Sequence, residues 1–295
     1  MYKVQQVDLK ANGFTFSCRI SGMENKGGEL IVFLHGFPES SVMWERLMIE
    51  MAQKGYRCLA PDQRGYSEGA RPDGMEHYTH RKLAGDVMAL AAYYDEGKKF
   101  HLVGHDWGAN MGWVLVTLYA ERIQTYSALA TPYTKDYLEV VIKDPAQRKK
   151  SQYIFDFLEP GKSEREYAEN HYAKLWAVYP EGFPEDILAV YKALFTQPGA
   201  LTATINWYRP KFLQALDMQK FEEDIPFGDV VMPVLYIWGT ADLYSGKTGV
   251  DTAHKYMMNE YKFVQLQGAG HWLMEFNYEV CAKEISGIIE KFPLE

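Results

Sequence analysis

The sequence predicts an α/β protein with a mostly parallel, doubly wound sheet that is interrupted once by a block of helices. Two observations predict this fold. Short apolar runs alternate with amphipathic stretches, and each run ends in Gly, Pro, Asp or His. Continuous apolar runs of this length are typical of strands that are buried on both faces, as in a parallel sheet. Parallel neighbours need a long crossover, which the helical patterns between the runs supply.

The elements can be assigned in order from the N-terminus. Residues 5–20 alternate between polar and apolar side chains around Asn12-Gly13, which predicts a hairpin. Buried strands are predicted in "ELIVFLHGFP", "YRCLAPDQRG" and "KFHLVGHDWG", and a further strand in "YSALA", before Thr131-Pro132. The helices predicted between these strands cover residues 41–53, 79–95 and 107–120.

The pattern changes between residues 133 and 227, where helical periodicity is broken by Pro and Gly and no strand pattern is found. Strand patterns resume in "VLYIWGTAD" and "KFVQLQGAGHW", and a last amphipathic helix is expected at 277–291. We therefore expect a first core segment (1–132), a helical lid (133–227) inserted after the sixth strand, and a second core segment (228–295).

Composition excludes several classes of function. The net charge is −8 and no cluster of Lys and Arg occurs, which disfavours nucleic acid or an anionic membrane as a partner. The three cysteines are scattered, and neither a signal peptide nor a membrane span is found. We expect a soluble, cytoplasmic protein. Aromatic residues reach 15%, which fits either ordinary packing or a pocket for an apolar ligand.

Polar residues follow four predicted strands at their carboxyl ends, where open α/β sheets bind ligands. They are His35, Asp106, Asp242 and His271. Asp106 is the centre of the turn "GHDWG", where many hydrolases carry a nucleophilic serine. Each residue alone could be a helix cap, a turn residue or a satisfied histidine. Because a nucleophile, an acid and a histidine follow one another in the order of a hydrolase triad, we expect a catalytic site.

Seven segments carry a family resemblance, five in the predicted core and two in the lid. The core segments are "HGFPES" (35–40), "DQRGYS" (62–67), "GHDWG" (104–108), "GTAD" and "GAGHW", and the lid segments are "QYIFDFLEPG" (152–161) and "INWYRP" (205–210). Because these segments occur together and in this order, the chain resembles the α/β-hydrolase-fold epoxide hydrolases over nearly its whole length. The resemblance implies the α/β-hydrolase fold and hydrolysis of an epoxide to a vicinal diol.

The same resemblance implies the roles of the catalytic residues. Asp106 would be the nucleophile, His271 the base that activates water, and Asp242 the acid that orients the histidine. Asp106 is ionised at neutral pH because an ordinary aspartate has a pKa of about 3.9, so it can attack a saturated carbon and form an ester. Tyr208 and Tyr153 would protonate the opening ring. "YIFDF" departs from the tyrosine-rich form of this segment, so Tyr172 and Tyr137 remain alternatives to Tyr153.

The resemblance also implies how the site holds the substrate. The backbone N–H groups of Phe37 and Trp107 would form the oxyanion hole. Apolar contacts with the substrate are expected from Phe37, Trp107, Trp207 and Trp272. His35 and Glu39 would brace the oxyanion loop, Pro38 is a candidate for a cis peptide bond, and His105 should point away from the pocket.

The main alternative is a dehalogenase, which uses the same aspartate and ester. Its halide would need N–H donors, from Trp107 and either Trp176 or Trp207. However, Phe37 stands where many haloalkane dehalogenases carry Asn, and Trp107 and Asn110 stand where fluoroacetate dehalogenases carry arginines, so an epoxide is favoured.

Other classes of function fit less well. A serine esterase is disfavoured because Ser127 lies on a strand, whereas a ligand receptor without activity stays open. The eight histidines show no paired metal-ligand spacing. We expect no metal or cofactor, an apolar aryl or alkyl epoxide and water as partners, and either a monomer or a homodimer.

Overall fold

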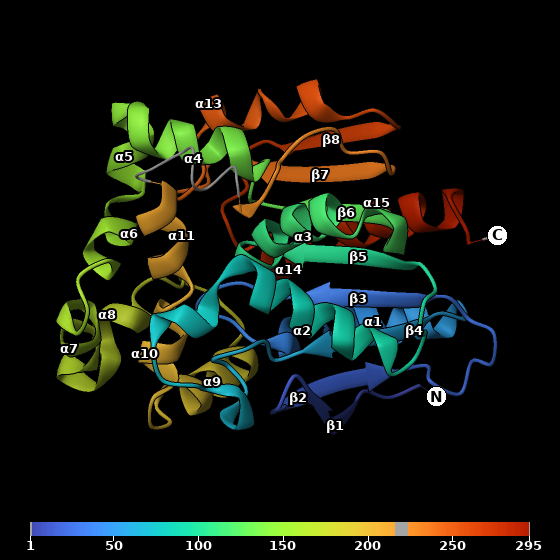
Figure 1. Ribbon diagram of the computed structural model, residues 1–295, viewed down its shortest axis with the longest axis horizontal. Helices are drawn as coiled ribbons and strands as arrows, with labels where there is room; N and C mark the ends of the chain where they lie inside the picture. Colours follow the sequence, from blue (N-terminus) through green and yellow to red (C-terminus); the bar gives the residue numbers. More distant parts are fainter. Residues whose placement is uncertain (1, 216–223, 295) are drawn as a thin grey trace.

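The computed structural model describes residues 2–215 and 224–294 (Figure 1). In this part of the chain, eight strands form one sheet in the order β1-β2-β4-β3-β5-β6-β7-β8. β1 pairs antiparallel with β2 and β2 with β4, whereas every other neighbouring pair is parallel. The predicted mostly parallel sheet is confirmed, as is the hairpin at Asn12-Gly13. The strands are β1 (Gln5–Ala11), β2 (Phe14–Ser21), β3 (Leu30–Leu34), β4 (Arg57–Pro61), β5 (Phe100–His105), β6 (Ile123–Leu129), β7 (Val234–Gly239) and β8 (Tyr261–Leu266).

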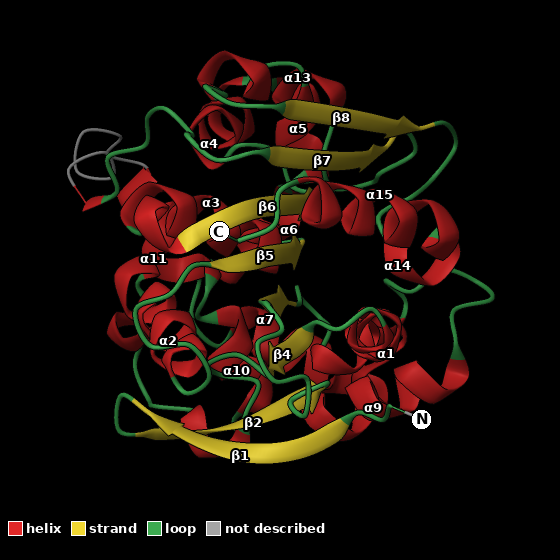
Figure 2. Cartoon of the chain, turned by 90° about the vertical axis from the view of Figure 1, so that its right-hand side faces the viewer, coloured by secondary structure: helices red, strands yellow, loops and turns green. Residues whose placement is uncertain are grey.

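Helices cover both faces of this sheet (Figure 2). α1 (Glu45–Gln53), α14 (Leu273–Phe276) and α15 (Tyr278–Lys291) lie on one face, and α2 (His80–Ala92) and α3 (Trp107–Leu118) lie on the other. Two buried apolar clusters fill the layers between the helices and the sheet. Shorter turns complete the core: η1 (Ser41–Trp44), η2 (Glu68–Ala70), η3 (Met75–Tyr78), η4 (Ala120–Arg122), α13 (Lys247–Val250) and η6 (Ala253–Tyr256).

Among its described residues, the chain between β6 and β7 forms helices that are joined by turns and loops. Helices α5 to α11 gather beyond one end of the sheet, drawn from green to orange in Figure 1. The segment predicted as a lid, 133–227, includes residues 216–223, which lie outside the described residues. The elements are α4 (Thr134–Lys143), α5 (Pro145–Lys150), α6 (Gln152–Phe157), α7 (Lys162–Ala168), η5 (Glu169–Tyr172), α8 (Ala173–Trp176), α9 (Glu185–Phe195), α10 (Ala200–Ile205) and α11 (Tyr208–Ala215).

The turn from β5 into α3 is unusually tight, and two glycines allow it. A Cβ atom on Gly108 would lie 2.1 Å from the carbonyl oxygen of Leu34, and one on Gly104 would lie 2.4 Å from the carbonyl oxygen of Gly108. Asp106 stands between them with φ 52° and ψ −116°, a conformation that costs about 1–3 kcal/mol outside glycine. Because β3, β5 and α3 approach this closely, the side chain of Asp106 is presented at the edge of the sheet.

Gly108→Ala should therefore lower the free energy of unfolding by roughly 1–3 kcal/mol, the usual cost of overpacking. Gly287→Ala is the matched control, because Gly287 is also helical, is exposed, and has no atom within 4 Å of an added Cβ. This control should stabilise the protein by about 0.5–1 kcal/mol. Urea unfolding measures both variants, and equal effects would contradict the close packing at Gly108.

Candidate active site

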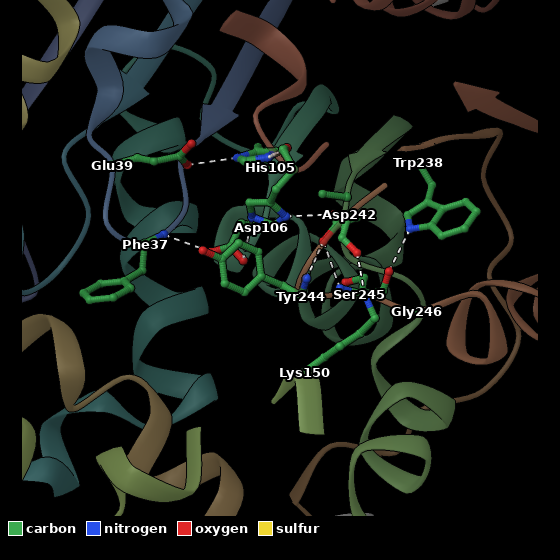
Figure 3. Close-up of polar contacts among 12 residues, drawn as sticks. Phe37, Glu39, His105, Asp106, Lys150, Trp238, Asp242, Tyr244, Ser245 and Gly246 are labelled. Atoms are coloured by element: carbon green, nitrogen blue, oxygen red, sulfur yellow. Dashed lines mark hydrogen bonds and ion pairs between the residues drawn. The ribbon is translucent and has the colours of Figure 1, made fainter. Parts of the chain in front are cut away.

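Asp106, Asp242 and His271, which are far apart in the sequence, meet beyond the carboxyl ends of β5, β7 and β8 (Figure 3). Nδ1 of His271 lies 2.8 Å from Oδ2 of Asp242. Nε2 of the same ring lies 3.4 Å from Oδ2 of Asp106. The imidazole therefore bridges two carboxylates, which is the geometry of a nucleophile, a base and an orienting acid.

The second oxygen of each carboxylate is held by backbone N–H groups. Phe37 donates its N–H to Oδ1 of Asp106 at 2.9 Å. Tyr244 and Ser245 donate theirs to Oδ1 of Asp242 at 2.7 and 2.9 Å. As a result, in both aspartates Oδ2 is the oxygen that faces His271. Trp107, the other expected donor to Asp106, is the first residue of α3.

The loop that carries Phe37 is braced from behind. The N–H of Gly36 donates to Oε2 of Glu39 at 2.7 Å, and Nδ1 of His105 lies 2.9 Å from the same oxygen. Nε2 of His105 lies 2.9 Å from the carbonyl oxygen of His271, so this ring points away from the cavity, as expected. The peptide bond between Phe37 and Pro38 is cis, also as expected.

His35 braces the same loop from the other side. Its Nε2 accepts the N–H of Gln63 at 3.2 Å, and its carbonyl oxygen accepts the Gln63 side-chain amide at 2.8 Å. Burial lowers the pKa of His35, so the ring is neutral at physiological pH. This neutral form matches its acceptor role at Nε2.

The charges at the site determine which groups are ionised. Burial acts to raise the pKa of Asp106, but the hydrogen bond and charge of His271, the charge of His105 and the Phe37 N–H together lower it. Burial acts to lower the pKa of His271, but Asp242 and Asp106 raise it well above its usual value. The contact between the two side chains therefore favours the charged form of each.

Two hollows meet at Asp106. Both are lined by Asp106, Tyr153, Tyr208 and Tyr244. The first hollow continues past Trp107, Asn110, Thr131, Tyr137, Ile154, Phe212 and Ser245, and the second past Phe37, Pro38, Tyr167, Val178 and His271. These four shared residues therefore surround the place where the two hollows join.

Tyr153 and Tyr208, the two predicted lid acids, are both at this meeting point. Their ring centroids are 5.9 Å apart, and the ring of Tyr208 lies 4.8 Å from that of Trp107. Burial raises the pKa of both hydroxyls well above 10. Tyr137 and the charge of Asp106 raise that of Tyr153 further, and Tyr153 and the charge of Asp106 raise that of Tyr208. Both therefore remain protonated and able to donate over the whole neutral range.

The two alternatives to Tyr153 fit less well. Tyr137 lines the first hollow, but its hydroxyl donates to the carbonyl oxygen of Tyr244 at 3.1 Å. Tyr172 packs against Trp176, with ring centroids 5.9 Å apart, and lines neither hollow.

Of the four side chains expected to contact a substrate, two line the hollows and two do not. Trp207 donates its indole N–H to the carbonyl oxygen of Arg64 at 2.7 Å, and Trp272 packs against Tyr179 at 4.9 Å between ring centroids. Neither lines the hollows, whereas Trp107 and Phe37 do. Trp207 and Trp272 are held by packing behind the residues that line the hollows.

Sequence reasoning missed Tyr244. Its ring centroid lies 4.7 Å from that of His271 and 5.7 Å from that of Tyr153, and it lines both hollows. The only signal in the sequence is its position just after Asp242, in the loop "TADLYSG".

Among the described residues, no three His, Cys, Asp or Glu side chains are grouped so that they could hold a metal ion. Within residues 2–215 and 224–294, no helix has the length and apolarity needed to cross a membrane.

Comparison with known proteins finds that the relatives of this chain are hydrolases. Residues 29–278 match the family model described as alpha/beta hydrolase fold. The chain is 31% identical to the AB hydrolase superfamily protein YfhM of Bacillus subtilis, over 90% of this chain and 91% of that protein. It is 30% identical to Epoxide hydrolase A of Mycobacterium tuberculosis, over 84% of this chain and 86% of that protein.

Solved structures agree with these relatives. Epoxide hydrolase VrEH1 from Vigna radiata superimposes with a TM-score of 0.85 and 26% identity, covering 98% of this chain and 99% of that one. Epoxide Hydrolase A from Mycobacterium thermoresistibile gives 0.81 and 26%, covering 99% and 100%. The chain therefore belongs to the α/β-hydrolase fold family and, within it, to the epoxide hydrolases.

Proposed function

We propose that the protein hydrolyses an apolar aryl or alkyl epoxide to a vicinal diol through a covalent ester on Asp106. One observation carries the proposal. An ionised carboxylate and two tyrosines whose pKa is raised border the same hollows, beside the His271–Asp242 pair. Opening an epoxide needs such a nucleophile and such an acid at one place. Residues 133–227 would act as the lid that carries the two tyrosines.

In the first step, Oδ2 of Asp106 attacks a ring carbon. A bond forms between that oxygen and the carbon while the ring C–O bond breaks, and the ring oxygen takes a proton from Tyr153 or Tyr208. Oδ1 stays on the Phe37 N–H and becomes the carbonyl oxygen of the ester. The raised pKa of the tyrosines keeps the acid protonated until it is needed.

In the second step, His271 removes a proton from water, which attacks the carboxyl carbon of Asp106. The negative charge that develops on Oδ1 is stabilised by the Phe37 N–H and by the proposed Trp107 N–H. The bond between this carbon and the alkyl oxygen then breaks, and that oxygen takes the proton that His271 had removed from water, which releases the diol. The second proton of the water, left on the carboxyl group of Asp106, returns to the tyrosinate, so both groups are restored. Esterification removes the negative charge of Asp106, which together with Asp242 had raised the pKa of His271. The pKa of His271 should therefore fall once the ester has formed, which favours its role as the base.

A dehalogenase is supported less well by the same contacts. Trp207 donates its indole N–H to the carbonyl oxygen of Arg64, and Trp176 donates to that of His171 at 3.0 Å. Both expected partners of Trp107 in halide binding are thus engaged away from Asp106. Diol release from styrene oxide, without halide release from a chloroalkane, is the experiment that separates the two functions.

His271→Ala should form the ester and then stall, because the histidine acts only in the second step. Intact-protein mass spectrometry with styrene oxide should detect an adduct equal to the epoxide's mass. Asp106→Ala, which lacks the nucleophile, is the control and should stay unmodified. Absence of the adduct in His271→Ala, while the wild type turns over, would count against this scheme.

Tyr153→Phe and Tyr208→Phe should each slow ester formation, and the double variant should slow it by about 10²–10⁴, the usual contribution of a general acid. Tyr172→Phe is the matched control and should leave the rate unchanged, because Tyr172 lines neither hollow. Rapid-quench mass spectrometry measures the rate of ester formation. An unchanged rate in the double variant would exclude the tyrosines as acids.

The two steps should differ in their dependence on pH. Ester formation needs ionised Asp106, whose pKa is lowered, and protonated tyrosines, whose pKa is raised. Its rate should therefore stay level from below about pH 4 to above about pH 10, the ordinary values for these groups.

Ester hydrolysis needs neutral His271, so its rate should rise as pH increases through the pKa that this group has in the ester. Single-turnover rates between pH 5 and pH 10 test both steps. If ester formation titrated together with hydrolysis, His271 would also be required in the first step.

A further inference from the structure

The loop that carries the catalytic acid is fixed from the lid side. We call residues 242–246 the acid loop. Within it, the N–H groups of Tyr244 and Ser245 hold Oδ1 of Asp242, and Oδ2 faces His271. The path of the acid loop therefore sets the direction of the carboxylate, and through it the orientation of the imidazole.

Gln147, on lid helix α5, binds the acid loop at two backbone groups. Its side-chain N–H donates to the carbonyl oxygen of Tyr244 at 2.6 Å, and its Oε1 accepts the N–H of Gly246 at 2.8 Å. The same amide is also in contact with the hydroxyl of Ser151 at 2.8 Å. Gln147 is only 2% exposed, so these bonds are formed away from water, where loss of one is costly.

Lys150 makes a third contact from the same helix. Its Nζ donates to the carbonyl oxygen of Asp242 at 2.7 Å (Figure 3). The position of α5 is itself fixed at its start, where Oδ1 of Asp144 accepts the N–H groups of Ala146 and Gln147. Helix α5 is thus capped at its start and holds the acid loop through two side chains one turn apart. Gln147 binds at Tyr244 and Gly246, and Lys150 binds at Asp242. We call these contacts of Gln147 and Lys150 the clamp.

The core also supports the acid loop. Trp238, on β7, donates its indole N–H to the carbonyl oxygen of Ser245 at 3.1 Å, and the N–H of Asp242 donates to the carbonyl oxygen of Gly239 at 3.1 Å. The side chains from outside the loop that bind the backbone of Asp242, Tyr244 and Gly246 instead come from segments between β6 and β7. The ring of Tyr244 lies against His271, so the clamp also supports the base directly.

We propose that Gln147, assisted by Lys150, is a positioning residue that couples docking of the lid to hydrolysis of the ester. This inference rests on the proposed two-step function. Attack by Asp106 on the epoxide does not require the Asp242–His271 pair, whereas attack by water on the ester does. Loosening the acid loop should therefore slow the second step and spare the first.

The coupling has a kinetic signature that general destabilisation lacks. When hydrolysis of a covalent intermediate slows and its formation does not, the intermediate accumulates. Both kcat and KM then fall in the same proportion, and kcat/KM stays constant. A misplaced lid would instead move the tyrosines and lower kcat/KM.

The test uses the full chain with styrene oxide and follows the ester by rapid-quench intact-mass spectrometry. Gln147→Ala should slow hydrolysis about tenfold, as expected for loss of buried hydrogen bonds, and leave ester formation within about twofold of wild type. Lys150→Met should slow hydrolysis about threefold, and Lys150→Arg, which keeps a donor, should restore most of that loss.

Gln152→Ala is the matched control. Gln152 is an exposed lid glutamine on α6, and its amide donates to Oδ1 of Asp156 at 3.5 Å, away from the acid loop. Both of its rates should equal those of the wild type. Thermal unfolding checks that each variant is folded. If Gln147→Ala does not fold, the two Lys150 variants test the proposal without it.

The experiment distinguishes failure of the proposed function from failure of this inference. If the wild type turns over without any ester, the proposed function is wrong and the inference falls with it. If the ester forms but the clamp variants hydrolyse it at the wild-type rate, the inference alone is overturned. The inference is also overturned if formation and hydrolysis slow by equal factors, because the clamp would then have only a general structural role.

Discussion

The site depends on the position of one carboxylate, that of Asp106, at a turn that only glycine neighbours permit. Gly104 and Gly108 let β3, β5 and α3 approach until Asp106 adopts a positive φ. The Phe37 N–H then holds Oδ1 and leaves Oδ2 facing His271. A serine at such a turn would need a base before it could attack, whereas this aspartate is already an anion. In the proposed mechanism, the contact between Asp106 and Phe37 therefore joins the nucleophile to an oxyanion donor.

In the proposed mechanism, the order of the two steps follows from the charges around His271. Asp242 and Asp106 flank the ring and raise its pKa. Esterification would neutralise Asp106 and leave only Asp242 beside the ring, so the first step would lower the pKa of the base that acts in the second. The proposed coupling through α5 and the acid loop would place this base under the influence of the lid, which would also contribute Tyr153 and Tyr208.

Much of this arrangement could be predicted from the sequence because it depends on local patterns. Apolar runs located the buried strands, and residues at strand ends located Asp106, Asp242 and His271, since parallel strands end at one edge. Whether Trp207 and Trp272 line the hollows depends on where each indole points, which residue order does not reveal. Tyr244 and Gln147 were missed for a related reason. Their contacts join segments distant in sequence, and Gln147 acts through an amide that no motif distinguishes.

The central claim is that the carboxyl group of Asp106 becomes part of the intermediate. A single turnover of styrene oxide in ¹⁸O-water tests it, with excess enzyme and mass analysis of the peptide containing Asp106 and of the diol. The proposed route places the label in Asp106 and leaves the first diol unlabelled, because water attacks the carboxyl carbon and the diol leaves with an original aspartate oxygen. Label in the diol and none in Asp106 would mean that water attacks the epoxide directly, which contradicts the ester mechanism.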